Sequence, residues 1–225
     1  MRALLKEAWT LAIESLSWME MRKLSERLAL ARTVRQLGIG DVDAIRLAHG
    51  LVCETARRRN FIDAFINNVL KPESLSELNL GVQAFLRLYV YQTRIAKNWS
   101  KINVEEAEDI AKLARSILGW KTLRRVERVL GLLLTQEPTS VLEGMSDEER
   151  MGLLTFHPTR FVRYCFRLLG RREAIAMLEA DLQFPPTYVR LNTLRAGESE
   201  ILERFKEEGV KIEKVEQLRQ TYRVM

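Results

Sequence analysis

The sequence is poor in the residues that build metal sites and disulfide frameworks. Its 225 residues include two cysteines, Cys53 and Cys165, and two histidines, His49 and His157. Neither histidine has a partner at the spacing of zinc ligands, and no Cys-x-x-Cys pair occurs. These shortages exclude the common structural zinc sites and a disulfide-stabilised secreted fold. We therefore expect no metal site and reduced thiols, the usual state in the cytoplasm.

Glycine-rich phosphate loops and long apolar runs are also missing. The sequence contains neither Gly-x-Gly-x-x-Gly nor Gly-x-x-x-x-Gly-Lys-Ser/Thr. Its longest apolar runs are far too short to span a bilayer, and its charged N-terminus carries no signal-peptide pattern. No pairing of a nucleophile with a base stands out either. We therefore expect no catalytic, cofactor-binding or metal-binding residue in this chain, no membrane partner and a cytoplasmic location.

Positive charge is concentrated in one part of the chain. The net charge is +6. Residues 1–135 hold 22 Lys and Arg against 15 Asp and Glu, a net charge of +7, whereas residues 136–225 hold 14 against 15. One interpretation is a module that binds a polyanion, joined to a nearly neutral platform. The other is an ordinary solvated surface, and charge alone does not choose between them.

Helical periodicity runs through the first 135 residues. It predicts helices over residues 1–20, 23–37, 42–58, 60–70, 76–95, 104–118 and 121–134. Gly38 is expected to end the second of these helices, and Asp41 to cap the third. In the second helix, Leu24, Leu28, Ala31, Val34 and Leu37 are expected to form the apolar face. With short connections and no strand pattern, residues 1–135 are expected to form an all-α helical bundle.

The last 90 residues change character at a proline pair. Residues 135–146 have a linker composition, and helices are expected over 147–154, 158–169 and 172–182. Pro185 and Pro186 then prevent any further helix. Alternating residues predict a strand over 187–194, followed by a helix over 199–208 and strands over 210–215 and 221–224. The fold class is therefore mainly α: a helical bundle followed by a small α+β domain with two or three short strands.

Arginine recurs along the helix expected over 158–169. Arg160, Arg163, Arg167 and Arg171 are spaced by three, four and four residues, so they are expected on one helix side. The other side is expected to be filled by Phe161, Val162, Cys165, Phe166, Leu168 and Leu169. Like charges at this spacing repel, so an all-arginine face favours a polyanionic partner, and guanidinium groups suit phosphate. The alternative is that these arginines meet acidic groups of a neighbouring domain.

Two further basic runs are candidates for contact with nucleic acid. The first is Lys121, Arg124, Arg125 and Arg128, expected on one side of a single helix over 121–134. The second is Arg57, Arg58 and Arg59 at a helix end, where the helix dipole alone favours cations. We expect no aromatic residue to be interleaved with these basic runs. We therefore expect contact with the phosphate backbone or the shape of RNA rather than base stacking.

Residues 185–195 carry a family resemblance. They read PPTYVRLNTLR and resemble the PPTYxRxNTL(K/R) signature of the Sun/RsmB family of RNA cytosine-5 methyltransferases. The resemblance extends over about residues 150–225. Residues 1–135 are similar in length, helical pattern and basic balance to the NusB-type RNA-binding domain that members of this family often carry. Residues 78–92 contain a leucine–tyrosine–glutamine run like that of a NusB helix.

The resemblance implies a division of labour. Residues 1–135 would form a NusB-like RNA-binding domain, and 136–225 a helical linker with the small α+β subdomain that precedes the catalytic fold. The family uses S-adenosylmethionine and cysteines in Pro-Cys and Thr-Cys-Ser contexts. Here the contexts are Val-Cys-Glu for Cys53 and Tyr-Cys-Phe for Cys165, and the chain ends at Met225 before any catalytic motif. No cofactor is therefore expected in this chain.

The expected function is thus RNA recognition on behalf of a catalytic domain that this chain lacks. The partners would be structured RNA, ribosomal or transfer RNA, and the missing catalytic domain of the same protein. Arg190 and Asn192, on the exposed side of the expected strand, would contact either the RNA or that domain. The rival hypothesis is a helical protein-interaction scaffold whose basic faces meet an acidic protein.

Overall fold

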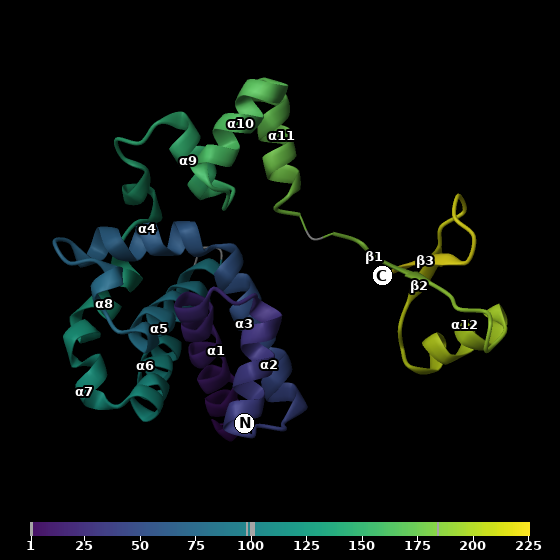
Figure 1. The fold of residues 1–225 in the computed structure, drawn as a ribbon, viewed down its shortest axis with the longest axis horizontal. Helices are drawn as coiled ribbons and strands as arrows, with labels where there is room; N and C mark the ends of the chain where they lie inside the picture. The colour runs from purple at the N-terminus through teal and green to yellow at the C-terminus, as the bar shows by residue number, and fades with distance from the viewer. Residues whose placement is uncertain (1, 98, 100–101, 184) are drawn as a thin grey trace. The chain divides into compact units, whose positions relative to one another are not determined.

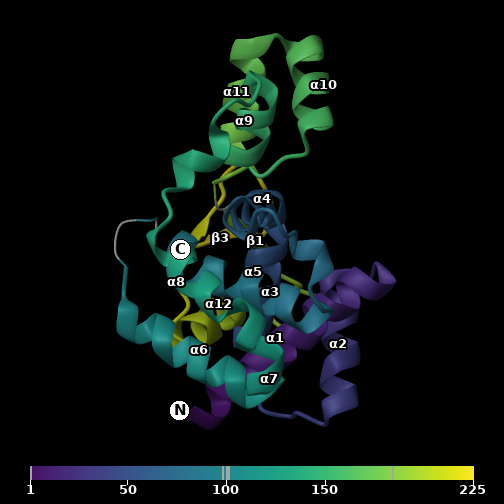
Figure 2. The same ribbon diagram turned by 90° about the vertical axis from the view of Figure 1, so that its left-hand side faces the viewer.

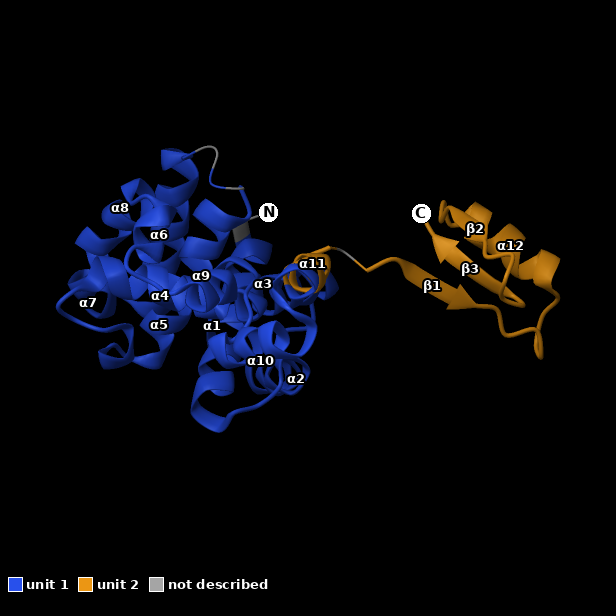
Figure 3. Cartoon of the chain, turned by 90° about the horizontal axis from the view of Figure 1, so that it is seen from above, with its two compact units in different colours: residues 1–174 blue, residues 175–225 orange. Residues whose placement is uncertain are grey.

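The structure, a computed structural model, describes residues 2–97, 99, 102–183 and 185–225. The chain divides into two compact units, residues 1–174 and 175–225, coloured blue and orange in Figure 3. The predicted boundary after residue 135, between an RNA-binding domain and a methyltransferase subdomain, stays a prediction.

The first unit is helical throughout its regular segments (Figure 1). Its elements are α1 (Arg2–Arg22), α2 (Glu26–Leu37), α3 (Val42–Arg57), α4 (Arg59–Leu70), the 3₁₀ turn η1 (Leu75–Glu77), α5 (Leu80–Val90), the π-helical turn η2 (Tyr91–Ile95), α6 (Val104–Leu118), α7 (Trp120–Leu123), the 3₁₀ turn η3 (Arg124–Val126), α8 (Glu127–Thr135), the 3₁₀ turn η4 (Pro138–Leu142), α9 (Asp147–Leu154) and α10 (Thr159–Leu169). Helix α11 (Arg171–Ala180) crosses the boundary between the units.

Local signals in the sequence set several helix ends. Gly38 has a φ of 65° and donates its amide to the Val34 carbonyl, which ends α2 as predicted. The Asp41 carboxylate accepts hydrogen bonds from the amides of Asp43 and Ala44, both at 2.9 Å, and caps α3 as predicted. Ser146 and Glu149 form a capping box at the start of α9.

Helix α5 lies at the centre of the first unit. Every residue from Val82 to Val90 is buried, and the helix contacts α1, α3, α4, α6 and α8. Such a helix has no polar face because it has no face toward water. Its largest fully buried side chains, Phe85, Leu86, Leu88 and Tyr89, would each contribute about 1.5–3 kcal/mol by leaving water.

A smaller cluster joins α1, α2 and α3, and it corrects the predicted face of α2. The buried residues of α2 are Ala29, Leu30 and Thr33, whereas Leu28 is 61% exposed. The Ser15 hydroxyl donates to the Thr33 hydroxyl at 3.3 Å, so small and polar side chains let α1 and α2 approach. Periodicity found the helix but placed the buried side about one residue away from where it lies.

The second unit holds a three-stranded antiparallel sheet with the order β1-β3-β2. Its elements are β1 (Thr187–Arg190), α12 (Glu198–Glu207), β2 (Ile212–Lys214) and β3 (Thr221–Val224). In the register, Thr187 pairs with Val224 and Arg190 with Thr221. The predicted strand over 187–194 is too long, because the Asn192 side chain accepts the Leu194 amide at 3.2 Å and turns the chain.

Candidate nucleic-acid interface

Helix α10 exposes a strip of arginines. Arg160, Arg163 and Arg167, hereafter the α10 arginine strip, are exposed and recur at the spacing of one helix side. Among the described residues, no acidic side chain forms an ion pair with any of the three. Arg163 attracts the Glu149 carboxylate at longer range and, after the hydrogen bonds from Ser146, helps to lower the pKa of Glu149. The strip is therefore a cationic surface largely without internal neutralisation.

Arg171 does not belong to this strip, contrary to prediction. Helix α10 ends at Leu169, and Gly170 has a φ of 79° that turns the chain before α11 begins. The Arg171 guanidinium instead donates to the Asp147 carboxylate of α9 at 2.6 Å. The spacing of the four arginines is helical, but Gly170 ends the helix before Arg171, so the prediction for Arg171 was wrong.

The apolar side of α10 is also less buried than predicted. Only Val162 and Cys165 are buried in this helix. Phe161 is 38% exposed, Leu168 64% and Leu169 43%. The reason is that α9 is short and covers a narrow part of α10. Tyr164, which the sequence interpretation did not assign, is half exposed.

The run from Arg57 to Arg59 lies at the junction of α3 and α4, and two of its members pair with acidic groups. Arg58 pairs with Glu54, and its guanidinium carbon lies 5.3 Å from the centre of the Phe156 ring. Arg59 pairs with Glu20 of α1 and, at 3.2 Å, with Asp63. Arg57 is exposed. Arg58 and Arg59 thus tie parts of the first unit together, whatever else they contact.

Arg59 belongs to an ion network that reaches the interior. Arg87 of α5 has a side chain only 6% exposed. Its guanidinium meets Asp63 through Nε to Oδ1 at 2.6 Å and Nη2 to Oδ2 at 3.1 Å. Burial acts to raise the pKa of Glu20, but Arg59, Lys23 and Arg87 outweigh it and hold that pKa below its ordinary value. The network fixes α1, α4 and α5 to one another.

The predicted helix over 121–134 is interrupted. It begins as α7, tightens into the 3₁₀ turn η3 at Arg124–Val126 and resumes as α8. Lys121, Arg124 and Arg128 are exposed, and Arg125 pairs with Glu73 at 2.9 Å. Helices α7 and α10 lie at opposite ends of the first unit (Figures 1 and 2), so this run does not join the α10 arginine strip.

The structure does bring the Arg57–Arg59 run and the start of α10 together. The Asn60 amide donates to the carbonyls of Gly152, at 2.9 Å, and His157, at 3.1 Å. An open hollow of about 320 Å³ lies at this junction; it is lined by Ala56, Arg57, Arg59, Asn60, Asp63, Phe156 and Pro158. No sequence motif signalled this contact, because its partners are 92 and 97 residues apart.

Arg190 and Asn192 lie in the second unit. Both side chains are exposed. Arg190 ends β1, opposite Thr221 of β3. Asn192 follows the strand, and its side-chain oxygen is engaged in the turn to Leu194. Only Arg190 therefore stands on the strand as predicted.

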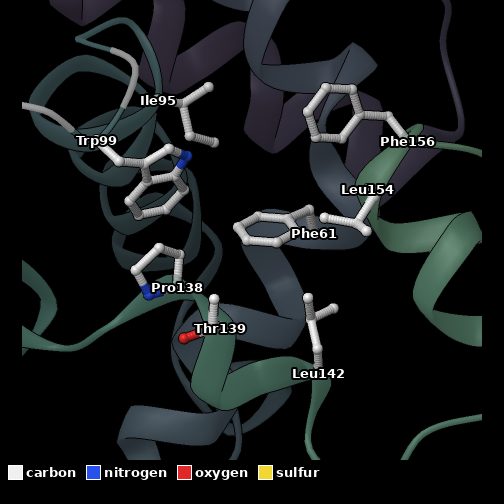
Figure 4. A pocket seen from close by; sticks show the side chains of 8 residues that line it. All are labelled: Phe61, Ile95, Trp99, Pro138, Thr139, Leu142, Leu154 and Phe156. Carbon is white, nitrogen blue, oxygen red and sulfur yellow. The ribbon is translucent and has the colours of Figure 1, made fainter. Parts of the chain in front are cut away.

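An apolar pocket of about 230 Å³ is a second concave feature of the first unit. Figure 4 shows its lining: Phe61, Ile95, Trp99, Pro138, Thr139, Leu142, Leu154 and Phe156. The ring centres of Phe61 and Trp99 are 5.6 Å apart in an edge-to-face arrangement. With no charged group among its lining residues, this pocket suits an apolar group and offers nothing for a phosphate.

Neither cysteine lies in surroundings that favour a reactive thiolate. Cys165 is buried in α10, and burial raises the pKa of the Cys53 thiol, the opposite of what a nucleophilic thiolate requires. Within the described ranges, no three metal-binding side chains gather at one point. In the same ranges, no helix combines the length and apolar character needed to cross a bilayer.

Comparison with known proteins shows the fold. No protein-family model matches the sequence, and no curated protein matches it either. The solved structure of PH0851 is similar with a TM-score of 0.62 and 15% identity, over 97% of this chain and 48% of that one. The chain therefore spans about half the length of PH0851.

Two solved structures match the helical part. A chain in the complex of the antitermination factors NusB and NusE with double-stranded RNA is 25% identical, with a TM-score of 0.50, over 60% of this chain and 98% of that one. A chain in the structure of a plectonemic RNA supercoil is 24% identical, with a TM-score of 0.51, over 63% and 99%. The predicted fold class is confirmed: mainly α and NusB-like, with a small antiparallel sheet near the C-terminus.

Proposed function

We propose that the chain is the RNA-recognition part of an S-adenosylmethionine-dependent RNA cytosine-5 methyltransferase of the Sun/RsmB type. It would hold structured RNA, most of all ribosomal RNA, for a catalytic domain outside these 225 residues. The observation that carries the proposal is the α10 arginine strip, three exposed guanidinium groups with no acidic partner among the described residues. Phosphate groups would supply the missing negative charge.

The fold supports the same proposal. The NusB-like match at 25% identity is to a chain from a complex that contains double-stranded RNA, and the second match comes from a structure named for its RNA. The residues matched by the methyltransferase signature, 185–195, lie in the second unit.

The candidate contact residues differ in the interactions that they already make within the fold. We assign the first RNA contact to the α10 arginine strip. Arg57, which lies across the junction that Asn60 holds, would contact the RNA only in addition to the interaction that it already makes. Lys121, Arg124 and Arg128, on α7, η3 and α8, are a second set of exposed basic residues, separate from the strip. Arg58, Arg59, Arg125 and Arg171 take part only in addition to their ion pairs. Arg190 contacts the RNA or the catalytic domain.

The methyl transfer itself belongs outside this chain. Neither cysteine fits a nucleophile that must reach a base, since Cys165 is 3% exposed and the pKa of Cys53 is raised. S-adenosylmethionine would therefore be held by the catalytic domain, and we assign no residue of this chain to it.

A salt titration tests the proposal. The double variant Arg160→Glu/Arg163→Glu should bind a structured ribosomal RNA fragment about tenfold or more weakly at low salt, because two charged phosphate contacts are lost. The slope of log affinity against log salt should become shallower by roughly 1.4–1.8. Fluorescence anisotropy at four or five salt concentrations measures both quantities.

A matched control separates local contact from net charge. Arg27→Glu/Arg46→Glu makes the same change of charge at two exposed helix positions, on α2 and α3, away from the candidate site. This control should keep most of the affinity. Equal losses in both variants would reduce the effect to net charge and remove α10 from the site. Tight, salt-independent binding of an acidic protein in place of RNA would favour the scaffold hypothesis, which the exposed Leu168 also supports.

A further inference from the structure

Aromatic rings lie beside the α10 arginine strip, where the sequence interpretation expected none. The rings of His157 and Phe161 are stacked, with centres 5.4 Å apart and an angle of 26° between their planes. Tyr164, one helical turn beyond Phe161, is 50% exposed. The Arg167 guanidinium carbon lies 5.8 Å from the centre of the Tyr164 ring. We call His157, Phe161 and Tyr164 the α10 aromatic ledge.

Phe161 and Tyr164 of the ledge lie on α10 together with the arginine strip, and His157 precedes the helix. Residues three or four apart are neighbours on a helix surface. Arg160 lies four residues before Tyr164 and Arg167 three residues after it, so the Tyr164 ring has a guanidinium group as a helix neighbour on each side along the axis. From Arg160 to Arg167 the helix rises by about 10 Å. About three stacked nucleotides of a single strand cover that length.

We infer that this ledge binds unpaired nucleotides of the RNA, with bases stacked on Phe161 and Tyr164 and phosphates on the arginine strip. The inference rests on the proposed function and narrows its substrate to RNA with a single-stranded loop, bulge or end. Aromatic side chains recognise RNA by stacking on unstacked bases, whereas a duplex hides the faces of its bases. The half-exposed Tyr164 ring, next to a guanidinium group, is such a stacking surface.

Charge complementarity favours RNA as the occupant of this surface. Residues 151–172 contain no acidic residue, and the longer-range attraction between Arg163 and Glu149 is not an ion pair, so the three arginines favour a ligand that carries negative charge. A nucleotide supplies a flat π face and a phosphate within the same unit, which matches rings and guanidinium groups on the same helix. An apolar protein segment would instead bury Leu168, which continues the ledge by one turn and is 64% exposed.

The test compares one RNA strand alone with the same strand in a duplex. Tyr164→Leu keeps apolar volume but removes the ring, and Tyr164→Phe keeps the ring. We expect Tyr164→Leu to weaken binding of the single strand about tenfold, Tyr164→Phe to bind like the native chain, and neither to change duplex binding. Leu168→Ala is the matched control and should leave single-strand affinity within about twofold. Circular dichroism and the melting temperature confirm that each variant is folded.

Abasic nucleotides sharpen the same test. Where the stacked base is replaced by an abasic sugar, the native chain should lose about as much affinity as Tyr164→Leu, and Tyr164→Leu should lose nothing more. One outcome is that Tyr164→Leu lowers the affinity for duplex and single-stranded RNA equally, or lowers neither. If Arg160→Glu/Arg163→Glu still lowers both affinities in that case, the ledge is overturned and the proposed function stands. If neither RNA binds the native chain, both are overturned. A loss of single-strand affinity in Leu168→Ala but not in Tyr164→Leu would show that no base stacks on Tyr164, and it overturns the ledge.

Discussion

Two groups of arginines in this molecule have opposite surroundings, although the sequence does not distinguish them. Arg87 is buried and meets Asp63 through two hydrogen bonds, and Arg94, also buried, donates to the backbone carbonyls of Leu134 and Gln136. Arg160, Arg163 and Arg167 are exposed and meet no described acidic group. The hydrogen bonds of the first group stabilise the fold, whereas under our proposal those of the second group bind RNA. The difference lies in the acceptor groups that the neighbouring segments place beside each arginine.

The largest expected effect breaks the interior group. Arg87→Met leaves Asp63 and Glu20 without their buried cation and should lower the free energy of unfolding by about 3–5 kcal/mol. Urea denaturation followed by circular dichroism measures it. Arg46→Met is the control, because its pair with Asp43 is exposed and should contribute less than about 1 kcal/mol. A loss for Arg87→Met as small as that of the control would show that the network does not stabilise the fold.

The next effect concerns how α10 is held in place. An added Cβ at Gly152 would lie 2.8 Å from the His157 carbonyl oxygen, at the contact that Asn60 also makes. Gly152→Ala should therefore destabilise the chain by about 1–3 kcal/mol.

Gly131 of α8 offers the matched control for Gly152. A Cβ there meets nothing within 4 Å, so Gly131→Ala should stabilise the chain by about 0.4–1 kcal/mol. Thermal melts of the two variants should move in opposite directions. A Gly152→Ala variant that melts above the native chain would contradict the close contact of Gly152 with the His157 carbonyl, which Asn60 of α4 also contacts.

The smallest effect is a pH dependence of the interior group. Because the pKa of Glu20 is lower in the folded chain than the ordinary value of a glutamate, its contribution to stability is complete above that ordinary value. The contribution is lost as the pH falls through the folded pKa. The difference in unfolding free energy between the native chain and Glu20→Gln should therefore shrink from pH 6 to pH 3. Glu143→Gln, at an exposed position, controls for the loss of one charge. If the difference in unfolding free energy grows on acidification instead, the pKa of Glu20 is raised in the folded chain and not lowered.

Local chemistry made much of the fold predictable. Gly38 and Asp41 fix helix ends through their own backbone and side-chain preferences, and the strand over Thr221–Val224 falls where alternation placed it. What failed depended on distant partners. The exposure of Phe161 and Leu168 follows from how little of α10 is covered by α9. The pairing of Arg59 follows from the approach of α1, which sequence spacing does not encode.

The candidate site was predictable in residue type but not in grouping. Spacing identified Arg160, Arg163 and Arg167, which lie on one helix side. It added Arg171, which a left-handed glycine removes from that side. It could not join Arg57 to the start of α10, since Asn60 makes that link across more than 90 residues.

The complete burial of α5 has a consequence for hydrogen exchange. Its backbone amides from Val82 to Val90 are covered on every side, so they should exchange with deuterium only when the whole first unit unfolds. The amides of α10 are covered on one narrow side, so they should exchange through local opening long before. The exchange rate of α5 thus gives an internal reference for global unfolding. In the same experiment, slower exchange of α10 in the presence of a ligand would measure how far that ligand protects α10.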